Sequence, residues 1–103
     1  VSSLKSSNVV NMSNMFEGTA ATTITGLDKL DTSNVTNMFS TFYATKVSIL
    51  DLSSFNTSKV TNMNYIFSNT SATIGYARNS SEVNKFNALS TSYKPSTLRF
   101  KLK

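Results

Sequence analysis

The acidic side chains are the first candidates for chemistry, because two nearby carboxylates can perform general acid–base catalysis. Asp28, Asp31 and Asp51 are the acids closest to the strands that the sequence predicts. Asp31 has no acidic counterpart at the equivalent positions of the neighbouring repeats described below, where the chain has Lys5 and Asn56. We therefore interpret the three aspartates as solvated turn residues and not as a catalytic pair.

The composition excludes most other catalytic and metal-binding arrangements. The 103-residue chain has no Cys and no His, which removes thiolate nucleophiles, disulfides, Ser-His-Asp triads and Cys- or His-ligated metal sites. Its three Gly are too few to build a phosphate-binding loop and also serve the turns. We expect a protein that is not an enzyme and that has no cofactor and no metal site.

Hydroxyl and amide side chains are abundant, with 18 Ser, 14 Thr and 12 Asn. Hydrophobic residues still make up 39% of the chain and aromatic residues 11%, which favours a folded domain over a disordered segment. The length allows one small domain. No apolar run approaches the roughly 20 residues of a membrane helix, so we expect no membrane span in this chain.

One short string of residues occurs three times along the chain at a nearly constant spacing. It reads SNVVNM from Ser7, SNVTNM from Ser33 and SKVTNM from Ser58. Such a period indicates structural repeats that bury equivalent side chains together. The residues that we expect in this repeated core are Val9, Met12, Phe16, Val35, Met38, Phe42, Val60, Met63, Phe67, Leu27 and Leu52.

The spacing within each repeat predicts a short helix. Val35, Met38 and Phe42 stand at i, i+3 and i+7, which is the apolar stripe of a helix of roughly 8–11 residues. The pair Thr32-Ser33 is its predicted N-cap, as Ser6-Ser7 and Thr57-Ser58 are in the other repeats. Gly18 is the predicted stop of the first helix.

A short strand is predicted before each helix. Residues 47–52 are rich in aliphatic side chains, and Leu50 and Leu52 share one face at the period of a strand. The equivalent strand, from Ile24 to Leu27, is interrupted by Thr25-Gly26 and is expected to be weaker. The sequence thus predicts an α/β fold: a short leucine-rich-repeat-like solenoid with one short strand and one short helix per repeat, closed by a C-terminal cap.

The charge distribution separates the last quarter of the chain from the rest. Residues 1–77 sum to zero charge, and residues 78–103 carry the whole net charge of +5. We divide the chain into three repeats over 1–77, the first incomplete, and a basic cap over 78–103. The cap should contain a helix with Val83, Phe86 and Leu89 behind Ser80-Ser81, and a strand with Leu98, Phe100 and Leu102 that adds beside Ile74 and Tyr76.

Three features have alternative interpretations. Asn11, Asn37 and Asn62 could line a ligand groove, but we favour hydrogen bonds to exposed backbone. The methionines at the equivalent positions could form a binding surface, but their place in the apolar stripe favours core packing. The basic segment interleaves aromatic residues as a nucleic-acid platform would, but alternating Leu and Lys favour a half-buried strand. We expect no nucleic acid partner, and weak binding to anionic wall polymers stays open.

The repeated strings also show a resemblance to a known family. The strings SNVVNMSNMFEG, DTSNVTNMFSTF and LDLSSFNTSKVTNMNYIF resemble the repeat of about 25 residues in BspA-type leucine-rich-repeat surface proteins of low-GC bacteria. The resemblance covers residues 1–77, and residues 76–100 are similar to the segment that often closes such arrays. It implies a secreted or surface-anchored bacterial protein, often proposed to be an adhesin, whose anchor lies outside this chain.

Two classes of function follow from this interpretation. The first is a non-catalytic extracellular module for adhesion, which would bind a protein or glycan on a host or neighbouring cell. The second is a structural spacer with no ligand of its own that displays another domain. A binder should gather exposed aromatic residues on one face, and the candidate contacts are Tyr43, Tyr65 and Tyr76.

Overall fold

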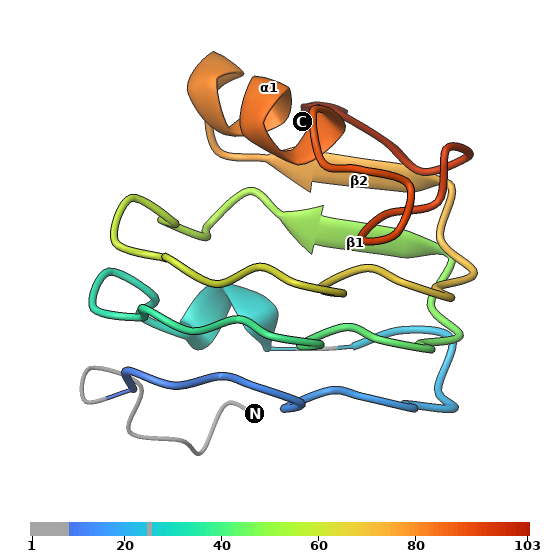
Figure 1. Ribbon diagram of the computed structural model, residues 1–103, viewed down its shortest axis with the longest axis horizontal. Coiled ribbons are helices and arrows are strands. Elements are labelled where there is room, and N and C mark those ends of the chain that lie inside the picture. Colours follow the sequence, from blue (N-terminus) through green and yellow to red (C-terminus); the bar gives the residue numbers. More distant parts are fainter. Residues whose placement is uncertain (1–8, 25) are drawn as a thin grey trace.

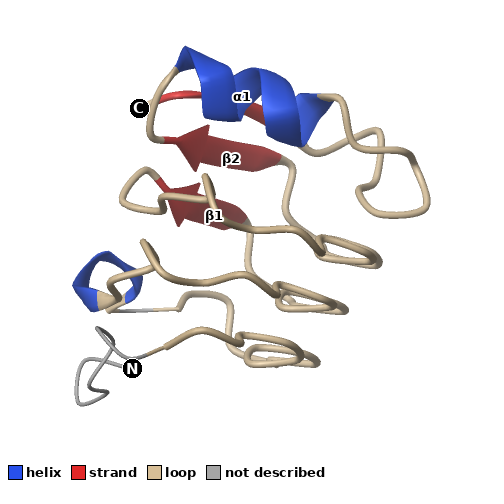
Figure 2. Ribbon diagram, turned by 60° about the vertical axis from the view of Figure 1, so that its left-hand side comes forward, coloured by secondary structure: helices blue, strands red, loops and turns tan. Residues whose placement is uncertain are grey.

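A parallel β-sheet forms one side of the molecule (Figures 1 and 2). The computed structural model describes residues 9–24 and 26–103. Its elements in chain order are the 3-10 helix η2 (Leu27–Lys29), β1 (Ile49–Leu52), β2 (Ile74–Ala77), α1 (Ser80–Asn87) and β3 (Arg99–Leu102). The strand order is β1-β2-β3, all parallel, so β2 is the central strand.

The two faces of the sheet carry different side chains because successive residues of a strand point to opposite sides. Leu50, Gly75 and Phe100 pair in register and face the core. Asp51 and Tyr76, each one residue further along its strand, lie on the outward face with Lys101 beside them. Strands predicted over 47–52 and 98–102, the latter beside β2, are therefore confirmed with slightly shorter bounds.

Three turn segments, residues 11–18, 37–44 and 62–69, run side by side away from the sheet (Figure 2). Backbone hydrogen bonds join them: Met12 N–H donates to the Asn37 carbonyl at 2.8 Å, and Met38 N–H donates to the Asn62 carbonyl at 2.8 Å. In the first two segments, every second N–H from these methionines onward bonds to the next segment in this way. The segments are thus held together by backbone contacts between neighbouring turns.

The helices predicted in these segments do not form. In each one the chain makes a series of tight turns, with left-handed residues at Asn14 (φ 61°), Ser40 (φ 53°) and Tyr65 (φ 57°). A left-handed residue cannot belong to a right-handed helix, and N–H groups that a helix would use internally bond to the next segment. Because these helices do not form, the predicted N-caps and the predicted helix stop at Gly18 are wrong as well. The predicted N-cap Ser6-Ser7 lies outside the described residues.

The choice of turns over helices has a local cause in the asparagine of each segment. The side-chain carbonyl of Asn37 accepts the N–H of Phe39 at 2.9 Å, two residues further on. Asn11 and Asn62 make the same bond to Ser13 and Asn64. Such Asx turns compete with helix formation, and Ser, Thr and Asn have low helix propensity. The prediction that these asparagines form hydrogen bonds to the backbone is confirmed.

The predicted leucine-rich-repeat-like solenoid is therefore wrong. A solenoid of strand–helix units would carry one helix per repeat, whereas the described residues contain one α-helix, α1, and three parallel strands in an open sheet. The second predicted strand, from Ile24 to Leu27, is also absent: Gly26 adopts φ 86° and leads into η2, and Thr25 lies outside the described residues. The molecule is a small globule with principal extents of 33 × 29 × 24 Å.

The helix α1 forms where the sequence offers a proper cap and ordinary helix formers. The side chain of Asn79, and not the predicted Ser80-Ser81 pair, accepts the N–H of Glu82 at 3.0 Å. Phe86 faces the core, and Glu82 is only 3% exposed. The Glu82 carboxylate accepts hydrogen bonds from the Thr57 hydroxyl and from Arg78 Nε at 3.1 Å, which ties the first turn of α1 to the globule.

A column of aromatic rings forms the centre of the core. Phe16 stacks on Phe42 with ring centroids 5.4 Å apart, and Phe42 stacks on Phe67 at 6.0 Å. The column continues to Phe100 at 5.1 Å from Phe67, and Phe86 closes it at 4.7 Å from Phe100. Offset ring pairs of this kind add about 0.5–1.5 kcal/mol each to the effect of area burial. The C-terminal segment thus belongs to the same core as the turn segments.

Candidate functional site

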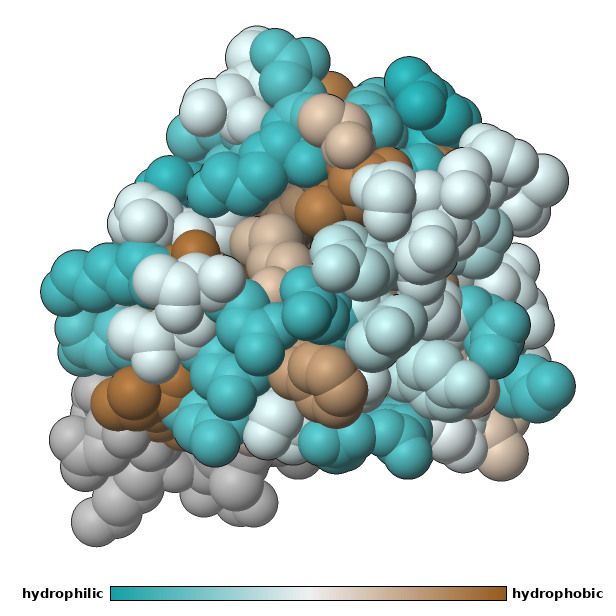
Figure 3. Space-filling model, viewed as in Figure 1, coloured by the Kyte–Doolittle hydropathy of each residue, from teal (hydrophilic) through white to brown (hydrophobic). Residues whose placement is uncertain are grey.

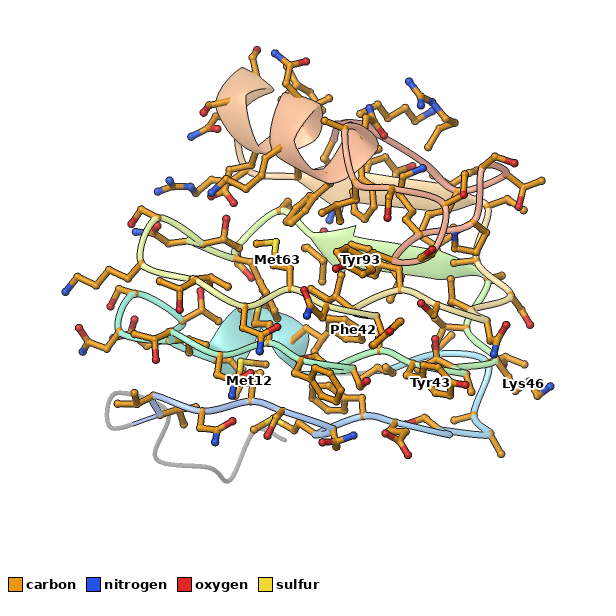
Figure 4. The ribbon with its side chains drawn as sticks, in the orientation of Figure 1. Met12, Phe42, Tyr43, Lys46, Met63 and Tyr93 are labelled. Carbon is orange, nitrogen blue, oxygen red and sulfur yellow. The ribbon has the colours of Figure 1, made fainter. Side chains whose placement is uncertain are left out.

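Most of the predicted core residues are buried where the sequence placed them. The buried ones are Met12, Phe16, Leu27, Val35, Met38, Phe42, Leu52 and Phe67, and those that pack against them with partial exposure are Val9, Val60 and Met63. Figure 4 shows Met12 and Met63 at different levels of the globule, with Phe42 at a level between them. The core interpretation of the methionines is confirmed, since Met12 and Met38 are each 1% exposed.

The three tyrosines proposed as partner contacts differ in their exposure and in their place in the fold. Tyr65 is 44% exposed on its turn segment. Tyr43 is partly buried, and its hydroxyl accepts a hydrogen bond from the Asn69 side chain at 3.2 Å. Tyr76 lies on the outward face of β2, where Lys101 Nζ is 5.8 Å from its ring centroid. Their contact with a partner stays a prediction.

The structure places two other aromatic residues beside Tyr65. Phe39 and Tyr65 meet edge to face with centroids 5.7 Å apart, and Tyr65 and Tyr93 meet in the same way at 5.5 Å. We call Phe39, Tyr65 and Tyr93 the aromatic row; Figure 4 labels Tyr93. Neither Phe39 nor Tyr93 was among the predicted contact residues. No helix or strand period joins positions so far apart in the sequence, so only the turn geometry reveals the row.

Tyr65 stands in an unusual backbone conformation. Its φ is 57°, a left-handed value that costs a residue other than glycine about 1–2 kcal/mol. The equivalent positions hold Asn14 and Ser40, small polar residues that tolerate this conformation better than an aromatic residue does. The left-handed conformation therefore belongs to the turn that the three segments share, and Tyr65 is the one residue of the three that places an aromatic ring there.

Asp31 and Asp51 each accept hydrogen bonds from the serine two residues further along the chain. The Asp31 carboxylate accepts the Ser33 hydroxyl at 2.6 Å and the Ser33 N–H at 3.0 Å, and these two bonds lower the Asp31 pKa. For Asp51, burial raises the pKa, but hydrogen bonds from Lys103 and Ser53 outweigh it, so the pKa is lowered. The interpretation as a turn residue holds for Asp31, but it is wrong for Asp51, which lies within β1, and Asp28 lies in the 3-10 helix η2. Among residues 9–24 and 26–103 no group of three or more acids could hold a metal ion.

A cleft of about 500 Å³ lies beside β1, and we call it the sheet-edge cleft. One wall comes from residues 22–24 and 26–28, and the other comes from residues 48–51. Asp28, Asp51 and Lys103 are the charged side chains that line it. Sequence reasoning did not predict this cleft, because it exists only where the expected second strand fails to form.

The basic C-terminal segment is part of the fold. Lys94 is 3% exposed, and its ammonium donates to the Leu98 carbonyl at 2.8 Å and the Pro95 carbonyl at 3.2 Å. Burial lowers the pKa of Lys94, and the positive charge of Arg99 lowers it further. Figure 3 shows teal and white side chains over most of one face, with brown apolar side chains only in small separate areas.

The fold and these surfaces define a small domain built from polar turns and one parallel sheet. Within the described ranges no helix is both long enough and apolar enough to span a bilayer. The family described as "Mycoplasma protein of unknown function, DUF285" matches residues 1–97, so the chain belongs to this family. Neither the curated proteins nor the solved structures gave a match.

Proposed function

We propose that this domain is a non-catalytic recognition module of a bacterial surface protein, and that the aromatic row binds a partner protein or glycan. The aromatic row is the observation that carries the proposal. The central ring, Tyr65, contacts the rings of both Phe39 and Tyr93 and is 44% exposed. A cluster of this kind is what distinguishes a binding surface from an evenly polar one.

The chemistry of the row suits recognition better than catalysis. Tyrosine provides a large contact area with few rotatable bonds, so binding orders little that was free. Tyr65 and Tyr93 also present hydroxyl groups that can bond to peptide or sugar. The chain has no His or Cys, and its carboxylates Asp31 and Asp51 are engaged with neighbouring hydroxyls. These facts support a module without enzymatic activity or cofactor.

The family and the sequence resemblance support the proposed location. The matched family is described as of unknown function, and the recurring strings resemble BspA-type surface proteins of low-GC bacteria. An adhesive role outside the cell, with an anchor elsewhere in the protein, is the proposal that fits both. Weak binding of the basic face of β3 to an anionic wall polymer belongs to the same proposal.

A structural spacer is the second candidate. The hydrogen bonding of buried polar side chains favours it. Among described residues, no buried side-chain nitrogen or oxygen lacks a hydrogen-bond partner. Thr41, Thr45 and Thr70 bond within the globule instead of facing a ligand. A spacer needs stability, and these internal hydrogen bonds contribute to it.

A comparison of variants separates the two candidates. The test is binding to glycan arrays and to intact bacterial and host cells, first with the unaltered domain and then with Phe39→Ala, Tyr65→Asn and Tyr93→Ala combined. Tyr65→Asn introduces the residue found at Asn14 and so preserves the turn. Loss of at least about tenfold in binding, with Tyr76→Ala as an unaffected control, is expected. Binding that survives the triple change would remove the aromatic row as the binding site, and the absence of binding by the unaltered domain would support the spacer.

A further inference from the structure

The parts of the chain that carry the aromatic row contain no charged residue. Asp, Glu, Lys and Arg are all absent from residues 36–45, 60–77 and 86–93, and each of these ranges carries one ring of the row. Lys94 directly follows the last range, but it is 3% exposed and its ammonium donates to two backbone carbonyls of its own turn. The three rings are therefore presented by an uncharged part of the protein.

Two asparagines of the same turn segments have a hydrogen-bond donor to offer. The side-chain oxygens of Asn37 and Asn62 accept the N–H groups of Phe39 and Asn64, both at 2.9 Å. The side-chain nitrogens of these two asparagines donate to no described residue, and both side chains are only partly buried. An amide that is held by its oxygen presents its nitrogen in a fixed position, where it can donate to an oxygen of a ligand.

The net charge of the protein lies on a different part of the chain. Residues 78–103 carry the whole net charge of +5, and Arg99 and Lys101 are exposed on β3. A site for a charged partner supplies charges of the opposite sign, because complementary charges orient such a partner. The segments of the aromatic row supply none, so they do not select a charged ligand, and an anionic polymer would be attracted to β3 instead.

A neutral sugar complements aromatic rings and amides that have no charged neighbour in their segments. The face of an aromatic ring carries partial negative charge, and the C–H groups on one side of a sugar ring carry partial positive charge, so the two rings pack face to face. Sugar hydroxyl groups can also accept hydrogen bonds from the amide nitrogens of Asn37 and Asn62. Tyr65, at 44%, is the most exposed residue of the row and is the ring on which a sugar can stack.

We propose that the aromatic row binds neutral glycans, with Tyr65 as the stacking ring and Asn62 as a hydrogen-bond donor. This inference rests on the function proposed above, because it names the class of ligand for the same site. A protein partner would bring charged side chains to the rim of the contact, and the segments that carry these rings have no charge to pair with them. The observations therefore favour a neutral glycan over a protein.

The test measures binding of the domain to immobilised neutral glycans, acidic glycans and peptides at two salt concentrations. At about 0.01 M and 0.15 M salt, charge interactions reach about 30 Å and 8 Å respectively. We expect binding to neutral glycans that changes by less than about twofold between the two conditions, because no charge takes part in it. Acidic glycans that bind through the basic face of β3 should lose most of their affinity at the higher salt concentration.

Three variants test the assigned roles. Tyr65→Asn removes the ring but keeps a residue that adopts the same turn at Asn14, and it should weaken neutral-glycan binding by at least about tenfold. Asn62→Asp keeps the oxygen that accepts the Asn64 N–H and removes only the amide donor, so it should weaken binding by about three- to tenfold. Asn11→Asp makes the same change in the first turn segment, which carries no ring of the row, and it should leave binding unchanged.

This inference and the proposed function fail on different results. Binding that is confined to peptides or acidic glycans, and that Tyr65→Asn abolishes, would overturn the neutral glycan but keep the aromatic row as a binding site. Equal effects of Asn62→Asp and Asn11→Asp would remove Asn62 as a donor to the ligand. Neutral-glycan binding that Tyr65→Asn leaves unchanged, or no binding to any of the immobilised ligands, would overturn both proposals.

Discussion

The two edges of the sheet are finished in opposite ways. At β3, the Asn87 side chain of α1 accepts the Phe100 N–H at 2.8 Å and donates to the Phe100 carbonyl at 2.9 Å. This amide makes the two bonds that a neighbouring strand would make. At β1, no described residue of the preceding segment pairs with Ile49–Leu52, and η2 and the sheet-edge cleft lie beside the strand. One side-chain amide takes the place of a neighbouring strand at Phe100, whereas on the other side a left-handed glycine precedes η2 and no described strand pairs with β1.

The closed side of the sheet also completes the core, and its removal should have the largest effect. Deleting residues 96–103 removes Leu98, which is fully buried, and Phe100, whose ring contacts Phe67 and Phe86. Burial of two such side chains contributes about 1.5–3 kcal/mol each, a large part of the stability of a small domain. We expect the deleted protein to lack a cooperative thermal transition in circular dichroism. A retained transition would show that β3 is an appendage.

Loss of the amide that closes the β3 edge should have the next largest effect. Asn87→Leu leaves the Phe100 N–H and carbonyl without partners, which should cost about 1–3 kcal/mol in the free energy of unfolding. The opened edge should also allow association between chains. Chemical denaturation and analytical ultracentrifugation measure the two effects, with Asn84→Ala on the exposed side of α1 as control. An Asn87→Leu protein as stable and as monomeric as the control would contradict the closed-edge account.

The close approach of β3 to β2 depends on Gly75. A methyl group at this position would collide with the ring of Phe100, its partner in the register. Gly75→Ala should therefore destabilise the domain by about 1–2 kcal/mol through overpacking. Combining it with Phe100→Leu, which removes the ring, should cost less than the sum of the two single changes. If the two losses of stability simply add in thermal denaturation, the ring of Phe100 does not pack against Gly75.

The ion pair across the outward face should have the smallest effect. Lys103 and Asp51 pair at 2.6 Å with side chains 63% and 39% exposed, so solvent screens the interaction. The hydrogen bond from Lys103 to Asp51 and the charge of Asp51 raise the Lys103 pKa, and the Asp51 pKa is lowered. We expect Lys103→Gln to change the thermal midpoint at neutral pH only slightly.

The pH dependence of this small difference follows from the two shifts. The lowered pKa of Asp51 adds stability above its unfolded value of about 3.9, and this is lost as pH falls through the folded value. The raised pKa of Lys103 adds stability below its unfolded value of about 10.4, and this is lost as pH rises through the folded value. The thermal midpoints of the two proteins should thus differ between pH 5 and 9, and they should converge only as the pH falls below about 3.9 or rises above about 10.4. A difference in thermal midpoint that persists at pH 2 would show that it does not arise from this ion pair.

The apolar pattern predicted which residues are buried better than it predicted their secondary structure. Met38 and Phe42 are buried as the helical stripe required, although the chain between them makes tight turns with Ser40 in a left-handed conformation. A series of turns and a helix can both bring the fourth residue back to the same side. The asparagine of each segment did indicate a turn. An analysis of the spacing of apolar residues does not take such polar residues into account.

The features that close and open the sheet could not be predicted from spacing. Asn87 and Phe100 meet only because α1 lies over β3, and nothing in the sequence distinguishes Asn87 from other asparagines. The buried pair of Glu82 and Thr57 and the exposed Leu102, 55% accessible at the end of β3, depend on tertiary placement in the same way. The interrupted motif at Gly26 did indicate a weaker strand, and the structure shows a 3-10 helix there instead.

Amide hydrogen exchange tests the difference between the two edges most directly. In the unaltered domain, Phe100 N–H should exchange as slowly as Arg99 N–H, which bonds to the Thr73 carbonyl of the segment leading into β2. Along Ile49–Leu52, amides directed to β2 should be equally slow, and those directed to the sheet-edge cleft should exchange at least about a hundredfold faster. Fast exchange at Phe100, or uniform protection of all four β1 amides, would contradict a sheet that is closed at β3 and open at β1.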